Sequence, residues 1–311
     1  MRKAKLSPAK INVQGRSVAE ILDLHTAWLE NRSGERAYFV GGTLPDADLR
    51  KTDLRKAIFN GTSFLEADLS NADFSGAELV RCDFRNATLS RADLTGARLI
   101  DVNFQHCQMP ESNLSEAHLE GVLFSGANVR DSRLYEIRMN GCDFRSADLH
   151  DSYFNFALMT ECSFVEANLE NCSFLRARLR SCRFMAGKLR DANLSSVEAV
   201  DCDFRGAELN SARLNLANLS QSVFHRAAMS NCDLCESNLS AADFSGAVLV
   251  NSHLREATLM ATDFRDSVLE GARGLTGRQL ANSLTSPSTV LPSGTRGPFV
   301  QGKNFELPLF R

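Results

Sequence analysis

Nine cysteines and six histidines are the residues of this 311-residue chain that could bind a metal, form disulfides or act as nucleophiles. Eight of the cysteines occupy the same place in a five-residue pattern, where alanine or serine otherwise stands: Cys82, Cys107, Cys142, Cys162, Cys172, Cys182, Cys202 and Cys232. A free cysteine in a small-residue position behaves as a buried hydrophobe, so we interpret these eight as packing residues. Cys235 lies outside that place, and we expect it to face solvent as the reactive thiol.

Other signatures of catalysis are missing from the sequence. The six histidines never stand at the spacing of metal ligands: His25, His106, His118, His150, His225 and His253. The chain has no phosphate-binding glycine loop, no G-x-S-x-G elbow and no H-E-x-x-H motif. We therefore predict no catalytic residue, no metal site and no cofactor, and a protein that is not an enzyme.

The pattern that positions these residues is a repeat of strict period five. From position 39 to position 269, 41 of 47 successive fifth residues are Leu or Phe. A typical unit reads Ala67-Asp68-Leu69-Ser70-Asn71. Helices repeat near 3.6 residues and strands near 2, so period five fits a short extended segment followed by a corner. The large residue and the small residue two before it are expected to point inward, and glycine suits the corner.

A slower period of 20 residues gives the number of corners in one coil. Phenylalanine recurs without a break at this spacing: Phe64, Phe84, Phe104, Phe124, Phe144, Phe164, Phe184, Phe204, Phe224, Phe244 and Phe264. Equivalent rings stack if four pentapeptides complete one coil and coils lie roughly 4.8 Å apart. The predicted fold is all-β, a quadrilateral β-solenoid of about 12 coils with a short capping helix at each end.

This pattern resembles the consensus Ala-(Asp/Asn)-Leu-X-X of the pentapeptide-repeat family, and the resemblance covers residues 37–273. It implies a right-handed solenoid. A well-known branch of the family mimics duplex DNA and protects type II topoisomerases such as DNA gyrase, with the acidic rod standing in for the phosphate backbone. Fold-level analogy is a weak guide to function, so this implication is kept as an alternative.

The remaining chain divides into end segments. We predict an N-terminal segment 1–36 with a helix that begins at a capping box of Ser17 and Glu20. The solenoid covers 37–273, and a second helix with a Thr276–Gln279 capping box occupies 274–284. Residues 285–311 are expected to be a mostly irregular tail. Its apolar end, Phe305–Phe310, is expected to fold back on the rod or to dock on a partner.

Charge and hydropathy limit the compartment and the partners. Residues 41–273 hold 33 acids and 24 bases, a net charge of −9, whereas the first 40 and the last 38 residues are each +3. An acidic rod argues against direct binding of nucleic acid. No apolar run is long enough to span a membrane, and no signal core follows the basic N-terminus, so we expect a cytoplasmic protein. Delivery out of the cell is left open.

One stretch departs from the small or mixed polar character of the other outward positions. The candidate partner-binding residues are Tyr135, Tyr153, Phe156, Leu158, Leu175, Arg138, Arg176, Arg178 and Arg180. Aromatic anchors beside arginines have the composition of interface hot spots. An imperfect repeat whose odd residues lie flat on the surface would explain the same sequence without a partner.

We therefore favour a non-enzymatic scaffold that presents a rigid surface to an unidentified protein partner. The alternative is the DNA mimic that binds and protects DNA gyrase. The 24 bases along the rod, the arginine band and the lack of a loop insertion argue against the mimic. A homodimer formed through an end of the rod is left open.

Overall fold

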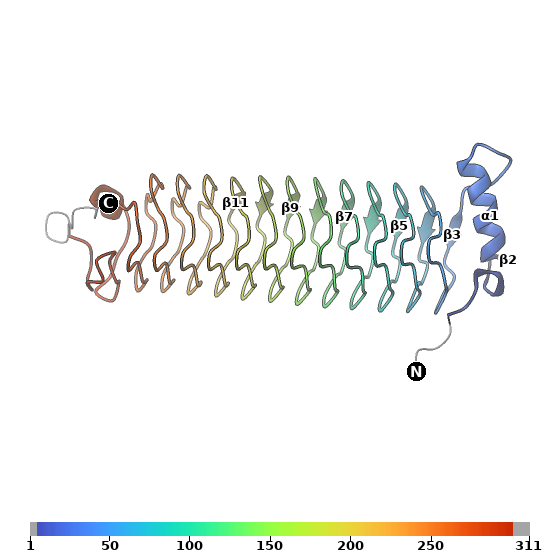
Figure 1. Cartoon of the computed structure of the whole chain (residues 1–311), viewed down its shortest axis with the longest axis horizontal. Helices are drawn as coiled ribbons and strands as arrows, with labels where there is room; N and C mark the ends of the chain where they lie inside the picture. Colours follow the sequence, from blue (N-terminus) through green and yellow to red (C-terminus); the bar gives the residue numbers. More distant parts are fainter. Residues whose placement is uncertain (1–4, 301–311) are drawn as a thin grey trace. The chain divides into compact units, whose positions relative to one another are not determined.

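The computed structural model describes residues 5–300, which divide into two compact units between Phe154 and Asn155. Unit 1 covers residues 5–154 and unit 2 covers residues 155–300. Each unit is a β-solenoid of stacked coils, as the predicted fold class requires (Figure 1).

Up to residue 200, one side of each coil carries a three-residue strand, and the later coils pair only through isolated bridges. In unit 1 these strands are β3 (Tyr38–Val40), β4 (Ile58–Asn60), β5 (Glu78–Val80), β6 (Arg98–Ile100), β7 (His118–Glu120) and β8 (Arg138–Asn140). In unit 2 they are β9 (Leu158–Thr160), β10 (Arg178–Arg180) and β11 (Glu198–Val200). Consecutive strands within a unit pair in parallel at a register of 20 residues, as between Leu79 and Leu99. The other sides pair through isolated parallel bridges at the same spacing. Four pentapeptides therefore complete one coil, as predicted.

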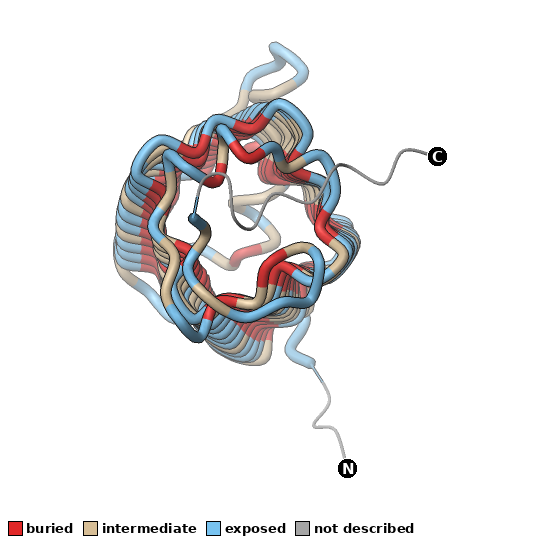
Figure 2. The backbone as a smooth tube through the Cα atoms, turned by 90° about the vertical axis from the view of Figure 1, so that its left-hand side faces the viewer, coloured by how far each residue is buried: buried red, intermediate tan, exposed pale blue. Residues whose placement is uncertain are grey.

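The core is a column of side chains inside each unit. All 47 of the fifth-residue sites from Phe39 to Leu269 are buried. The stacked rings from Phe64 to Phe144 in unit 1 lie with their centroids 4.5–5.1 Å apart. The rings from Phe164 to Phe264 in unit 2 are 4.7–5.5 Å apart. The end-on view shows buried residues alternating with exposed ones along each coil (Figure 2). The predicted phenylalanine ladder is confirmed in both units.

The corners adopt a left-handed backbone. Gly61, for example, has φ 67° and Asp101 has φ 52°. Glycine adopts this conformation without strain, and asparagine and aspartate adopt it more readily than other residues. Two corner residues of this solenoid are large and apolar, Phe156 with φ 60° and Leu216 with φ 61°, and both are exposed.

The aspartate or asparagine before the large residue has a structural task. Its Oδ1 accepts a hydrogen bond from the backbone N–H two residues later, at 2.9 Å from Ser75 to Asp73 and 2.8 Å from Ser245 to Asp243. Such a side-chain bond stabilises the bend that leads into the corner. This explains why the repeat prefers Asp or Asn at this place.

The N-terminal segment covers the first coil of unit 1. It contains η1 (Pro8–Lys10), the antiparallel pair β1 (Asn12–Val13) and β2 (Arg16–Ser17), and α1 (Val18–Leu29). Ser17 caps α1 by accepting the N–H of Glu20. Beyond the helix, Gly34 passes so close to it that an added Cβ would lie 2.3 Å from the carbonyl oxygen of Leu24. The chain thus covers the edge that a stacked solenoid would otherwise expose.

The C-terminal end of unit 2 carries α2 (Gly277–Ala281), whose capping box of Thr276 and Gln279 is present as predicted. Between α2 and residue 300 there is no strand or helix, yet Leu284 and Val290 continue the parallel bridges of the last coil. Their backbone N–H groups donate to the carbonyls of Thr262 and Ser267 at 2.8 and 2.9 Å, which ties part of this segment to the coil. The predicted apolar cluster Phe305–Phe310 lies outside the described residues, and the four-part division of the chain stays a prediction.

Candidate functional site

The nine predicted partner-binding residues fall in both units. Tyr135, Arg138 and Tyr153 belong to unit 1. The other six belong to unit 2: Phe156, Leu158, Leu175, Arg176, Arg178 and Arg180. Each group is therefore described within its own unit.

In unit 1 the two tyrosines form an aromatic pair. Their rings stack with centroids 5.8 Å apart and planes inclined by 18°. Tyr153 is 42% exposed, and Tyr135 is half-buried. Arg138 begins β8 and is exposed. An offset pair of aromatic rings offers a partner a rigid apolar surface with two hydroxyl groups at its rim.

In unit 2 the most unusual residue is Phe156. Its backbone N–H donates to the carbonyl of Leu175 at 3.0 Å, which places Phe156 at one corner and Arg176 at the equivalent corner of the next coil. The phenyl group is 45% exposed. All corners of the coils share this positive φ, so what distinguishes Phe156 is an exposed aromatic ring at a place that mostly holds glycine, polar or charged residues.

Beside this corner, a groove of about 560 Å³ lies over β9, β10 and β11. Leu158 and Val200 are half-buried on its two flanking strands, and Arg178 and Arg180 stand on the middle strand. Arg178 bonds Glu198 across 3.2 Å. Leu158, Arg178 and Arg180, three of the predicted candidates, therefore line one groove.

Sequence reasoning missed several residues of this surface. Lys188 and Arg190 extend the positive charge of the same coil, Val200 lines the groove, and Leu216 is 55% exposed at a left-handed corner. Counting charges in 20-residue windows of the sequence would have identified Lys188 and Arg190. Val200 and Leu216 carry no signal in the sequence beyond being apolar at outward places.

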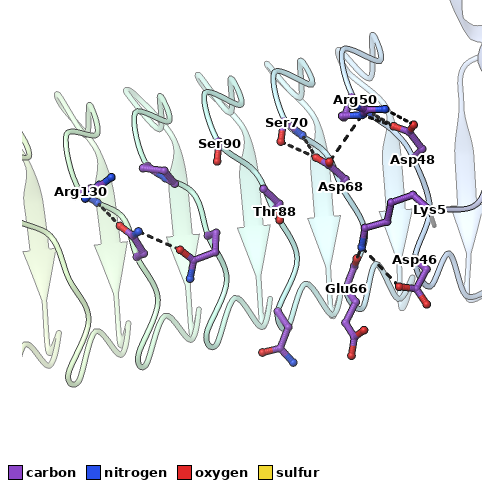
Figure 3. Close-up of a pocket in the computed structure, with 14 residues that line it drawn as sticks. Lys5, Asp46, Asp48, Arg50, Glu66, Asp68, Ser70, Thr88, Ser90 and Arg130 are labelled. Atoms are coloured by element: carbon purple, nitrogen blue, oxygen red, sulfur yellow. Dashed lines mark hydrogen bonds and ion pairs between the residues drawn. The ribbon is translucent and has the colours of Figure 1, made fainter. Parts of the chain in front are cut away.

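Unit 1 has a larger and more polar groove of about 1060 Å³ (Figure 3). Its charged groups are already bonded to one another. Arg50 holds Asp48 at 2.6 Å, and the ammonium of Lys5 lies 3.6 Å from Asp46. Asp68 accepts the hydroxyl and the N–H of Ser70. No histidine or cysteine lines this groove, so it offers neither a thiol nor an imidazole for catalysis.

The acidic residues of the repeat are largely occupied by local partners. Arg85 holds Asp83 through both guanidinium nitrogens, at 2.9 and 2.7 Å, and lowers the pKa of the Asp83 carboxyl. The same Asp-x-Arg contact recurs at Asp53–Arg55 and Asp143–Arg145 in unit 1, and at Asp203–Arg205 and Asp263–Arg265 in unit 2. Exposed pairs of this kind contribute little stability, but they neutralise carboxylates that a DNA mimic would present.

The cysteines do not form a reactive centre. The eight at the small inward place are buried, and burial raises the pKa of Cys82 to about 11 and that of Cys232 to about 12. Cys235 is half-buried, and its pKa is also raised, first by burial and then by Asp233. Cys235 is the one cysteine of the nine that is partly exposed, and its raised pKa disfavours the thiolate, so its role as the reactive thiol stays a prediction. Among residues 5–300, no three metal-binding side chains come together.

The fold and its surfaces define a class of protein: a filled repeat solenoid that offers other molecules its outer faces. Sequence models of the family described as pentapeptide repeats match most of this solenoid. The region model matches residues 77–154, and the eight-copy model matches 35–64, 47–86, 147–185, 162–198, 187–226, 202–240 and 237–273. The chain belongs to the pentapeptide-repeat family.

Several solved structures are similar to this chain. HetL, a pentapeptide repeat protein involved in heterocyst differentiation regulation in the cyanobacterium Nostoc sp. strain PCC 7120, is 26% identical; the match covers 73% of this chain and 92% of HetL, with a TM-score of 0.41. Full-length QnrB1, a plasmid-mediated fluoroquinolone resistance protein, is 19% identical over 70% of this chain and 93% of its own, with a TM-score of 0.29. A pentapeptide repeat protein of the Arabidopsis thaliana thylakoid lumen is 20% identical over 49% and 85%, with a TM-score of 0.19. No curated protein matches the sequence.

Membrane-spanning segments were also sought. Within residues 5–300, no helix combines the length and the apolar composition needed to cross a bilayer.

Proposed function

We propose that this protein is a non-enzymatic scaffold that binds a protein partner through the outer surface of unit 2 around Phe156, with the Tyr135–Tyr153 pair of unit 1 as a second contact. The observation that carries the proposal is the ring of Phe156, which is 45% exposed at a corner of the coil. An exposed phenyl group does not help a solenoid to fold.

The cost of this arrangement can be estimated. A residue other than glycine pays roughly 1–2 kcal/mol in the left-handed region. The other corners of the repeat hold mainly glycine, polar or charged residues. A phenylalanine that gains little burial at such a corner is best explained by a contact that forms on binding, since exposed aromatic groups supply much of the energy of protein interfaces.

A solenoid suits this role because its backbone is already ordered. Each coil is hydrogen-bonded to the next within its unit, as at Phe204 to Val223. A preformed surface loses little conformational entropy when it binds, so a few anchors can give specific recognition.

The experiment compares Phe156→Gly with Asn231→Gly in the full-length protein. Both substitutions place glycine at a left-handed corner of unit 2, with φ 60° and 61°, so both are expected to fold. Partners are captured from source-cell lysate and identified by quantitative mass spectrometry. We expect Phe156→Gly to lose specific partners that Asn231→Gly keeps. Identical partner sets for both variants would remove this surface from consideration.

The second candidate is a mimic of duplex DNA that protects DNA gyrase. It is favoured by the net charge of −9 over residues 41–273 and disfavoured by the Asp–Arg pairs, which leave fewer carboxylates free for a partner. Purified protein at micromolar concentration should then compete with DNA for gyrase and alter supercoiling. A homodimer through one end of the solenoid also stays a prediction, which sedimentation at several concentrations would test.

A further inference from the structure

We propose that the coil Asn171–Arg190 of unit 2 recognises an acidic segment of a protein partner, in which an apolar side chain is flanked by aspartate or glutamate. This inference rests on the proposed function, because it names the chemistry of the partner that the same surface would bind.

The first observation is the charge of this coil. Residues 171–190 contain six bases and no acid: Arg176, Arg178, Arg180, Arg183, Lys188 and Arg190. The preceding residues of unit 2, 155–170, contain three acids and no base, and residues 191–210 contain five acids and one base. This coil thus carries a net charge of +6 between two stretches that are each net acidic.

The second observation is that most of these cations lack a carboxylate. Arg178 pairs with Glu198 at 3.2 Å and Arg190 with Glu208 at 3.8 Å. Over the described range 5–300, the side chains of the other four form no ion pair: Arg176, Arg180, Arg183 and Lys188. They are all exposed.

The sequence shows why the pairing fails at this coil. Elsewhere in unit 2 two arginines that follow the large residue are each held by the aspartate before it, as Asp203 holds Arg205 at 2.6 Å. In this coil a cation replaces that aspartate, giving Arg178-Leu179-Arg180 and Lys188-Leu189-Arg190. Arg178 stands where the local carboxylate would be. The guanidinium of Arg180 is therefore available to a carboxylate from another molecule. Charge-assisted bonds from arginine to carboxylate are among the stronger protein hydrogen bonds.

The third observation is the groove beside these charges. Leu158 on β9 and Val200 on β11 flank Arg178 and Arg180 on β10, in a groove of about 560 Å³ that Glu198 and Asp201 also line. Phe156 and Arg176 lie at equivalent corners of successive coils. An apolar side chain can rest between Leu158 and Val200 while neighbouring carboxylates meet Arg180 and Arg176. The surface therefore fits an acidic segment with an apolar centre better than a purely charged one.

A nucleic acid fits less well because phosphate recognition needs cations along a continuous track. Here Glu161 and Glu170 precede the cationic coil, and Glu198 and Asp201 follow it. Phosphates extending beyond the coil on either side would meet these carboxylates. A short acidic protein segment can instead contact the single coil.

The test uses the full-length protein and a short fluorescent peptide in which Asp and Glu surround a central Leu-Phe pair. Anisotropy titrations compare it with the Asn/Gln version of the same peptide and with a short DNA duplex. The test variant is Arg176→Gln with Arg180→Gln, and the matched control is Arg205→Gln with Arg265→Gln, which removes two arginines already paired with aspartate. Circular dichroism checks that both variants stay folded.

We expect the acidic peptide to bind more tightly than the other two probes, with about tenfold weaker binding in the test variant and little change in the control. Three results would overturn the inference: no preference for the acidic peptide, equal losses in the two variants, or tighter binding of the duplex. If one of these occurs while Phe156→Gly still loses its partners, the scaffold stands and only the partner chemistry is wrong. If Phe156→Gly also keeps all partners, both proposals fall.

Discussion

The backbone N–H of Ala37 donates a hydrogen bond of 3.0 Å to the Nδ1 atom of His25. The Nε2 atom of the same ring lies 3.1 Å from the carbonyl oxygen of Arg55. Because a carbonyl only accepts, the proton resides on Nε2 and the ring is neutral. His25 is fully buried and stacks on Trp28 at 5.7 Å. The contacts of one imidazole thus join α1 to the start and the end of the first coil of unit 1.

This geometry predicts that acid loosens the N-terminal cap. Burial is the main cause that lowers the pKa of His25, with smaller contributions in the same direction from Arg36 and Arg55, whereas the Arg55 carbonyl and Asp53 oppose it. Since the unfolded histidine titrates near 6.5, its unfolded form binds more protons below that pH, and stability falls as pH drops through 6.5 towards the lower folded pKa. Hydrogen exchange of α1 amides should accelerate between pH 7.5 and pH 5.

The control for this prediction is His25→Gln, which keeps a donor and an acceptor but does not titrate in this range. Its α1 amides should exchange with a much weaker dependence on pH after correction for intrinsic rates. An unchanged pH dependence in His25→Gln would assign the effect to another group.

The phenylalanine ladder should carry much of the stability of each unit. The ring of Phe204 lies 4.8 Å from both Phe184 and Phe224 and is fully buried. Phe204→Ala is expected to cost about 3–5 kcal/mol through lost burial and a cavity. Denaturant unfolding measures this change, and Tyr153→Ser, at an exposed ring, should cost far less. Similar losses of unfolding free energy in the two variants would contradict the assignment of Phe204 to the core and Tyr153 to the surface.

The aspartate of the repeat should act through its hydrogen bond rather than through its charge. Asp73 accepts the N–H of Ser75 at 2.9 Å and its hydroxyl at 2.6 Å. Asp73→Ala should cost about 1 kcal/mol, as the loss of a capping side chain does, whereas Asp73→Asn should be nearly neutral. Thermal unfolding of the two variants checks this. Equal destabilisation would mean that the negative charge itself is needed.

The strained corner at Leu216 offers a stabilising substitution. Leu216 has φ 61° and is 55% exposed, so it gains little burial for its strain. Leu216→Asn should raise stability by about 0.5 kcal/mol, because asparagine tolerates the left-handed region better. The measurement is the midpoint of denaturant unfolding. A clear loss of stability would show that the leucine packs more tightly than its exposure indicates.

Thiol titration should separate the nine cysteines into two groups. Eight are buried, and only Cys235 is half-buried, with a raised pKa. With an aromatic disulfide reagent at neutral pH, we expect at most one slow reaction in the native protein and nine after unfolding. Cys235→Ser should abolish the native reaction. Rapid modification of several thiols would show that the coils open.

Much of the fold could be predicted because the interior of a solenoid repeats along the chain. A large residue every fifth position and a phenylalanine every twentieth specify which side chains point inward and which ones stack, as Phe64 and Phe84 do at 4.5 Å. The two helices were equally visible, since the N-cap bond at Ser17 and the capping box at Thr276 each involve residues three apart. Local spacing sufficed for all of these features.

The candidate surface was only partly visible in the sequence. Phe156 and Arg180 stood out as departures from the repeat, but their surroundings depend on residues 20 apart in the chain that stacking brings together. Only the tertiary structure shows that Arg178 meets Glu198 at 3.2 Å while Arg180 has no ion pair within residues 5–300.

The sequence by itself determined the period, the coil and the inward column, because each follows from residue type at fixed local spacing. The tertiary structure decided which charges are paired, that His25 is buried and neutral, and that Cys235 is half-buried with a raised pKa. Burial and electrostatic pairing depend on neighbours from other coils, and the pattern of a single coil does not contain them.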